Sequence, residues 1–153
     1  MHKPTKREII LAVTMFISYI IYVLIMSIIM DFIGLGDTGT STAGAVSLET
    51  LVSLIFSMMN EELIKFIPLM FFMRLFYKYS ENRNVSFILS SLIVLVGFGL
   101  LHYDGNTAIY SVLLYQGFGT IFEVYGYYKT RNLLVPYLSH LLTDAFLLSL
   151  TLL

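Results

Sequence analysis

Three short polar motifs interrupt apolar stretches of this chain, and their residue types are those that hydrolytic chemistry uses. The motifs are Glu61-Glu62 with Lys65, Phe98 with His102, and His140 with Asp144. Ionisable side chains are costly to keep at membrane depth, so each one is a functional-site hypothesis by default. Two carboxyl groups in different surroundings can divide the roles of general base and general acid, and either could activate a water. Together the motifs indicate catalysis.

In the first motif the spacing separates the two glutamates. Glu61 and Lys65 are four residues apart and share one face of an α-helix, whereas Glu62 points about 100° away. We therefore expect Lys65 to pair with Glu61 and to keep it ionised, and Glu62 to lie unpaired in an apolar setting. The alternative is a purely structural Glu61–Lys65 ion pair that locks the helix.

The two histidines are weaker signals when taken singly. His102 follows Phe98 at the end of an apolar stretch, where a helix cap or an interfacial residue is the simpler interpretation. His140 and Asp144 share a helix face, so Asp144 could orient the imidazole, both could bind one ion, or the pair could be structural. Polar groups on three different intramembrane helices are difficult to accommodate unless they meet in a shared cavity. This convergence favours a functional site in which the three motifs meet.

The composition determines which elements must position these residues. Hydrophobic residues make up 58% of the 153 residues and charged residues 12%, and the mean hydropathy is +0.83. A soluble domain of this size could not bury so much apolar surface, so we predict an all-α polytopic transmembrane bundle. Zero cysteines exclude disulfides, thiolate nucleophiles and sulfur ligands for a metal.

Five spans are expected within one domain, at residues 9–32, 47–77, 85–101, 107–128 and 133–153, with a polar loop at 34–44. Residues 1–45 would form an uncleaved anchor helix and this loop, and residues 46–153 the catalytic core. Eight of the nine Lys and Arg residues fall on alternate connections, which predicts a cytoplasmic amino terminus. Lys65 is the exception. The lipid bilayer is an expected partner and a nucleic acid is not.

The spans raise one geometric difficulty and contain one further carboxylate. At about 1.5 Å per residue, His102 lies roughly 26 Å along its span and His140 about 10 Å along its own. Straight, equally placed helices would keep the imidazoles apart, so we expect tilted or broken helices. Glu123, with Gln116 seven residues earlier on a similar face, is expected to make a hydrogen-bonded helix contact, with participation in the polar cavity as the alternative.

In order and spacing, the motifs resemble the CPBP or Abi family of intramembrane proteases, named for CAAX prenyl proteases and bacteriocin-processing proteins. That pattern is E-E-x-x-x-R, then F-x-x-x-H, then H-x-x-x-N or H-x-x-x-D, on successive transmembrane helices. Here it matches Glu61-Glu62, Phe98 to His102 and His140 to Asp144. Residues 127–136 also resemble the family's approach to its last motif, and the resemblance covers about residues 48–150.

The resemblance implies an intramembrane endopeptidase that cleaves peptides or lipidated proteins, in a bacterial cell membrane and with a possible part in self-immunity to bacteriocins. Glu61 and Glu62 would activate a water with His102, while His140 with Asp144 would complete the site and stabilise the oxyanion. The mechanism stays open between two forms. A divalent metal such as zinc would be held by Glu61, His102 and His140, whereas a glutamate-activated water needs no cofactor.

Lys65 and Phe98 would support the site, but the sequence departs from the family pattern next to them. Phe66 stands at the position of the family arginine, one residue after Lys65. E-E-x-x-K with H-x-x-x-D resembles the related PrsW-type proteases, which carry Glu where this chain has His102. Phe66 and the small size favour a non-catalytic membrane immunity or binding protein as the alternative. A small transporter or ion pathway is a third possibility, because buried Glu and His chains also relay protons.

Overall fold

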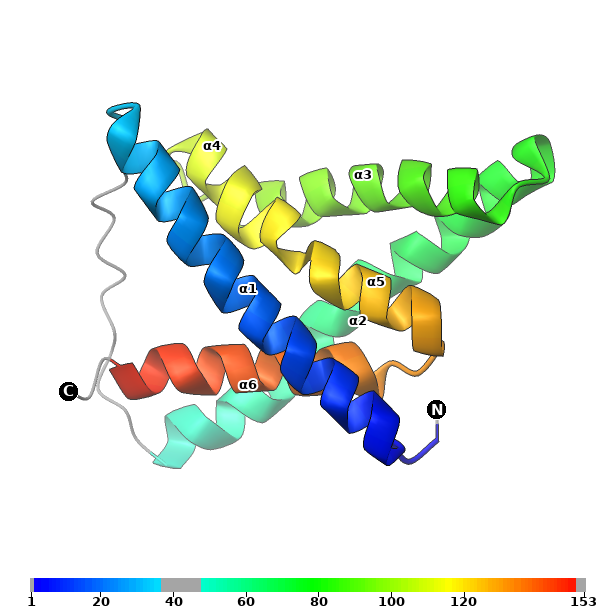
Figure 1. Cartoon of the computed structure of the whole chain (residues 1–153), viewed down its shortest axis with the longest axis horizontal. Helices are drawn as coiled ribbons and strands as arrows, with labels where there is room; N and C mark the ends of the chain where they lie inside the picture. Colours follow the sequence, from blue (N-terminus) through cyan, green and yellow to red (C-terminus); the bar gives the residue numbers. More distant parts are fainter. Residues whose placement is uncertain (1, 37–47, 151–153) are drawn as a thin grey trace.

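In the computed structural model, residues 2–36 and 48–150 are described, and this part of the chain is all-helical without strands (Figure 1). The expected helical fold class is confirmed. The principal helices are α1 (Lys6–Phe32), α2 (Leu48–Ser80), α3 (Arg83–Leu101), α5 (Ile121–Thr130) and α6 (Leu134–Leu150). Most of the polar loop expected at 34–44, the start of the span at 47–77 and the last three residues lie outside the described residues.

Local capping chemistry explains where two of the helices begin. At the start of α1, Glu8 N–H donates to the Thr5 hydroxyl and Thr5 N–H donates to the Glu8 carboxylate, which forms a capping box. At the start of α3, the Asn82 side-chain oxygen accepts the N–H groups of Asn84 and Val85. Both caps satisfy amide groups that have no partner within their helix.

The segment expected as one span at 107–128 is not a regular helix. A short α4 (Ile109–Ser111) leads into a π-helical segment (Val112–Gly117) and a 3-10 turn (Phe118–Thr120) before α5 begins. Gln116 is exposed whereas Glu123 is buried, so the expectation that they share a face is wrong. The reason is that π and 3-10 turns contain different numbers of residues from an α-helical turn, which rotates one side chain relative to the other.

Two glycines hold this irregular segment against α3. A Cβ atom added to Gly117 would lie 2.6 Å from the Leu95 carbonyl oxygen, and one added to Gly99 would lie 3.0 Å from the Val112 carbonyl oxygen. These obstacles are backbone atoms, which cannot swing aside as a flexible side chain can. The two backbones therefore approach each other more closely than any larger residue permits, as is common between membrane helices.

The exterior of the bundle is apolar and part of its interior is polar. Large side chains such as Ile28, Phe32 and Leu101 are exposed, while Glu62, Lys65 and Ser90 are fully buried. A surface of this kind suits lipid rather than water. Among the described helices, α1 and α3 are long and apolar enough to cross a membrane, and α6 is a shorter apolar helix. The number of five spans stays a prediction.

The basic connections gather at one end of the bundle, which we call the basic end: residues 2–7, 78–83 and 129–132 (Figure 1). Two hydrogen bonds tie these segments together. Asn132 Nδ2 donates to the His2 carbonyl oxygen at 3.0 Å, and Arg83 Nη2 donates to the Tyr128 carbonyl oxygen at 3.1 Å. This arrangement supports the alternation of basic and non-basic connections, and the cytoplasmic assignment of the basic end stays a prediction.

Candidate functional site

The motifs lie on α2, α3 and α6, and their polar residues come together because α3 and α6 meet α2 at different places along its length. In Figure 1, α3 lies along the second half of α2 and α6 crosses its first half. His102 is the residue that caps the carboxyl end of α3, and His140 lies inside α6. The two imidazoles therefore reach the Glu61 region from different directions along α2. This resolves the difficulty that straight, equally placed helices presented.

A partly exposed set of side chains, which we call the outer group, comprises Glu61, His102, His140 and Asp144. Glu61 Oε2 lies 3.8 Å from His102 Nε2 and 3.8 Å from His140 Nε2. Asp144 Oδ2 lies 3.9 Å from the same His140 nitrogen. The side chains of Glu61, His102 and Asp144 are 27%, 30% and 28% exposed, so this face of the cluster is open at the surface of the bundle. All five expected catalytic residues, Glu62 included, thus lie in one cluster.

The second nitrogen of each imidazole indicates the proton arrangement of the outer group. His102 Nδ1 lies 2.9 Å from the Phe98 carbonyl oxygen, and His140 Nδ1 lies 2.8 Å from Glu62 Oε1. Both partners are acceptors, so we assign the proton to Nδ1 in each neutral ring. Each Nε2 then presents a lone pair towards Glu61. In this form His140 cannot donate to an oxyanion, a role that requires a proton on its Nε2.

Behind the outer group lies a buried inner network of Glu62, Lys65 and Glu123, to which His140 Nδ1 is attached. Lys65 Nζ donates to Glu62 Oε1 at 2.7 Å and to Glu123 Oε2. Lys65 and Glu62 have no exposed surface, and Glu62 Oε2 finds no hydrogen-bond partner in the described part of the chain. The Phe98 ring centroid lies 4.7 Å from Lys65 Nζ and adds a cation–π contact.

The expected Glu61–Lys65 pair is wrong, because Lys65 binds Glu62 and Glu123 instead. Both i,i+3 and i,i+4 neighbours share a helix face, so spacing alone could not decide between the two glutamates. Burial decides: Glu62 turns inward with Lys65, where Glu123 provides a second carboxylate, while Glu61 turns towards the histidines. The two glutamates therefore exchange their expected roles: Glu62, not Glu61, pairs with Lys65, and Glu61 faces the accessible side.

The expectation for Glu123 also needs correction. It was expected to make a helix contact rather than to take part in the polar cavity, but it lies in the inner network and is nearly buried. The available signal was its position as a carboxylate in an apolar segment, which favours a polar cavity. The irregular backbone that turns Glu123 towards Lys65 could not be deduced from helical periodicity.

Two sets of side chains are candidates for a metal. Potential ligand atoms of Glu62, Glu123 and His140 all lie within 4.8 Å of one another. However, the Lys65 ammonium group already binds both of these carboxylates, and a divalent ion there would meet its positive charge. We therefore regard Lys65 as the cation of the inner network.

The outer group offers a second set of possible metal ligands, without a lysine among them. Its three lone pairs belong to Glu61, His102 and His140, and each histidine donates its other N–H to an oxygen, as metal-binding histidines usually do. Tetrahedral zinc with bonds of about 2.0–2.1 Å places ligand atoms roughly 3.3 Å apart. Glu61 Oε2 would need to approach each imidazole Nε2 by about half an ångström. These three ligand atoms are not among those that all lie within 4.8 Å of one another, so the two imidazoles would also have to move closer together to hold one ion.

The position of the family arginine is filled by a packing residue. Phe66 is buried and its ring lies 4.7 Å from that of Tyr127. It belongs to a hydrophobic cluster with Leu69, Val94, Leu95 and Val124. The buried positive charge is instead supplied one residue earlier by Lys65.

Comparison with known proteins identifies the family of this chain. A family model described as type II CAAX prenyl endopeptidase Rce1-like matches residues 43–146, which is more than half of the chain and contains every residue of the outer group and the inner network. No curated protein and no solved structure matches the chain. The family is a protease family, and together with the apolar helices it indicates a membrane protein. The chain belongs to the family of type II CAAX prenyl endopeptidases of the Rce1-like kind.

Proposed function

We propose that the chain is an intramembrane endopeptidase whose attacking water is held by the outer group. The observation that carries this proposal is the pair of 3.8 Å gaps between Glu61 Oε2 and the two imidazole Nε2 atoms. These gaps are too long for direct hydrogen bonds, and all three atoms are acceptors. A water at about 2.8 Å from Glu61 and from one imidazole would donate a hydrogen to each. Its lone pair would then remain free for attack.

In this mechanism Glu61 is the general base. Its carboxylate takes a proton as the water oxygen attacks the carbonyl carbon of the scissile peptide bond. The same proton then passes to the leaving nitrogen as the C–N bond breaks, which yields a carboxylic acid and an amine. One of the two imidazoles, His102 or His140, orients the water before the attack, and Asp144 lies beside His140 on the accessible side.

The inner network acts by positioning the outer group. Glu62 accepts the N–H of His140, which fixes that ring, and Lys65 with Glu123 fixes Glu62. Because these groups are buried, their arrangement is set before substrate arrives, and little reorganisation is needed during the reaction. If a divalent ion such as Zn²⁺ binds, Glu61, His102 and His140 would hold it, and it would supply Lewis acidity and a more acidic water.

An apolar pocket beside the site supports a lipidated substrate. It lies between α2 and α3, has a volume of about 300 Å³ and is lined by Ile64, Pro68, Phe72, Ile93, Val94, Gly97, Phe98 and Leu101. Phe98 both lines this pocket and accepts the N–H of His102 through its carbonyl oxygen. An apolar chain in the pocket would therefore hold an attached peptide close to the outer group. We infer peptides carrying a prenyl or similar chain as substrates.

The test is peptide cleavage by the full chain in nanodiscs, with prenylated and unprenylated forms of one peptide. We expect Glu61→Gln to lower kcat by roughly 10²–10⁴, the usual contribution of general base catalysis. The same substitution at exposed Glu81, in the turn after α2, is the matched control and should leave kcat unchanged. Loss of turnover with a chelator and its return with zinc would assign a metal to the outer group.

Two results would overturn the proposal. One is a Glu61→Gln variant as active as the wild type. The other is a wild type without turnover on any peptide of the set, although it is folded and protects cells against a bacteriocin. The second result would favour the non-catalytic immunity protein, for which Phe66 at the arginine position is the supporting observation.

A further inference from the structure

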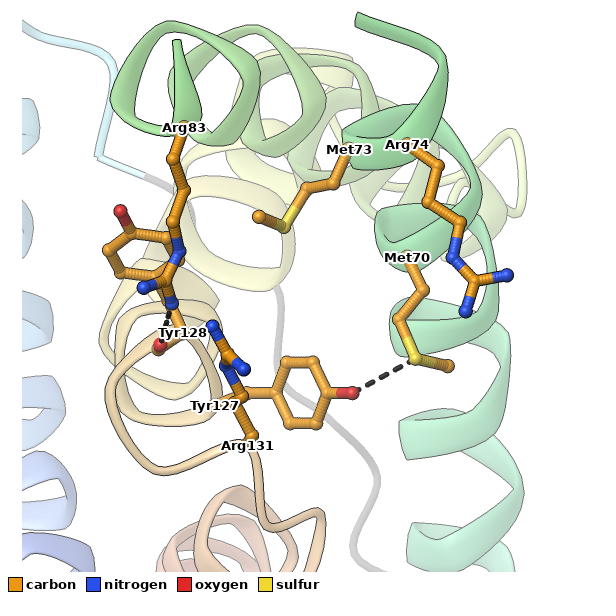
Figure 2. Close-up of a pocket in the computed structure, with 7 residues that line it drawn as sticks. All are labelled: Met70, Met73, Arg74, Arg83, Tyr127, Tyr128 and Arg131. Carbon is orange, nitrogen blue, oxygen red and sulfur yellow. Dashed lines mark hydrogen bonds between the residues drawn. The ribbon is translucent and has the colours of Figure 1, made fainter. Parts of the chain in front are cut away.

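Three arginines from three separate segments surround one pocket at the basic end (Figure 2). Arg74 lies in α2, Arg83 is the first residue of α3, and Arg131 directly follows α5. The pocket has a volume of about 360 Å³, and an adjoining hollow of about 350 Å³ is lined by the same three arginines. Within the described residues, none of the three forms an ion pair with a carboxylate. The pocket is thus strongly positive without a counter-charge.

Aromatic neighbours hold Arg83 in place. Its Nη2 donates to the Tyr128 carbonyl oxygen, and its guanidinium carbon lies 4.4 Å from the centre of the Tyr128 ring. The Tyr128 hydroxyl in turn donates to Asn84 Oδ1 at 2.8 Å. Figure 2 shows the guanidinium groups of Arg83 and Arg131 extending towards each other from two sides. One donor of Arg83 is used in this way, and its remaining donors are available for a ligand.

The backbone of Arg131 has a conformation that is unusual for a residue other than glycine. Its φ is 54° and its ψ is 23°, the left-handed conformation at the end of α5. Glycine or asparagine is usual at such a position, because other residues are strained there. Glu81, which follows α2, has a similar φ of 51°, so the conformation marks a helix end and fixes the direction in which the Arg131 side chain leaves the backbone.

The walls of the pocket define the class of ligand. Guanidinium forks match the oxygens of a phosphate group, to which they donate paired hydrogen bonds. Met70, Met73 and the ring of Tyr127 provide an apolar wall next to these charges. Basic pockets between membrane helices are suited to the head groups of anionic phospholipids. A head group would place its phosphate between Arg83 and Arg131, whose guanidinium groups extend towards each other, and its chains along the apolar surface (Figure 2).

We propose that this pocket binds a phosphate group, carried either by an anionic phospholipid or by a soluble compound. It is separate from the outer group and the inner network, because Arg74 is twelve positions after Glu62 in α2, which corresponds to about 18 Å. The proposal therefore does not depend on peptidase activity.

The test uses the full chain, purified and delipidated, in binding titrations with three probes. These are vesicles of phosphatidylglycerol, vesicles of phosphatidylcholine, and inorganic phosphate. Arg83→Gln and Arg131→Gly each remove one of the two converging guanidinium groups, and each should weaken binding about tenfold through the loss of charge-assisted hydrogen bonds. Lys78→Gln is the matched control, since it removes a charge one turn beyond Arg74 without altering the pocket lining.

Arg131→Gly also separates binding from folding. Glycine adopts the left-handed conformation without strain, so this variant should melt at the same temperature as the wild type or higher while its binding weakens. Saturable binding of phosphatidylglycerol that both arginine variants weaken supports the proposal with a lipid as the source. Saturable binding of inorganic phosphate, weakened in the same way, supports it with a soluble source. Binding that both variants leave unchanged, or that is equally strong with phosphatidylcholine and absent with phosphate, overturns it.

Discussion

Replacing Lys65 by methionine removes the positive charge of the inner network and tests whether this network holds the fold together. Methionine keeps much of the volume of the lysine stem but leaves Glu62 and Glu123 facing each other without a cation. All three side chains are buried or nearly so. Removal of one partner from a buried pair costs about 3–5 kcal/mol, because the remaining charge is left uncompensated. We expect a loss of unfolding free energy of about 4 kcal/mol.

Such a loss corresponds to a decrease in melting temperature of about 8–16 °C for a chain of this length. The assay is thermal unfolding of the purified chain in detergent, followed by circular dichroism of the helices. Lys78→Met removes a lysine from the exposed end of the same helix, and it should alter stability by no more than about 0.5 kcal/mol.

A double variant makes the test specific to the network. Glu123→Gln removes one of the two carboxylates, so in the Lys65→Met background it should restore part of the lost stability. The coupling between the two sites should reach about 1–3 kcal/mol, as for residues in one ion-pair network. A Lys65→Met variant as stable as Lys78→Met, or effects of Lys65→Met and Glu123→Gln that simply add, would refute the inner network as described.

Three further predictions concern helix packing, the apolar pocket and the cap of α3. Gly117→Ala should cost about 1–3 kcal/mol of stability because its Cβ would meet the Leu95 carbonyl oxygen. Gly97→Ala is the control: its Cβ meets nothing within 4 Å, so it should be neutral or stabilise the chain by up to about 1 kcal/mol. Equal melting temperatures of the two variants would contradict this. Gly97→Leu should fill the apolar pocket and lower kcat/KM for a prenylated peptide more than for its unprenylated form, and an equal effect on both would argue against the pocket as a lipid site. Asn82→Ala should cost about 1 kcal/mol through the lost cap of α3, measured by the same thermal unfolding, and an unchanged melting temperature would contradict it.

The helices and the cluster of motif residues could be predicted because each depends on a strong energetic bias. Apolar stretches of membrane length form helices since their backbone polar groups need internal partners. Charged residues in those helices converge since isolated charges are costly in such surroundings. For this reason Glu61, His102 and His140 could be placed together without knowledge of the helix packing.

The partners within the cluster could not be predicted, because they depend on differences that spacing does not encode. Glu61 and Glu62 are both within reach of Lys65 along the helix, and Glu123 decides between them from another segment. The arginine pocket was missed for a similar reason. Charge counting assigned Arg74, Arg83 and Arg131 to one side of the membrane, but only the turn conformations bring their side chains to one pocket.

The π-helical segment at Val112–Gly117 has a consequence for how this chain tolerates insertions and deletions. Each residue of an α-helix turns the chain by about 100°. A deletion of one residue in this segment would therefore rotate Glu123 away from Lys65, although every charged side chain would still be present. The length of this segment sets the rotation of Glu123 relative to α4 (Ile109–Ser111), so it is as constrained as the identity of the glutamate that follows it.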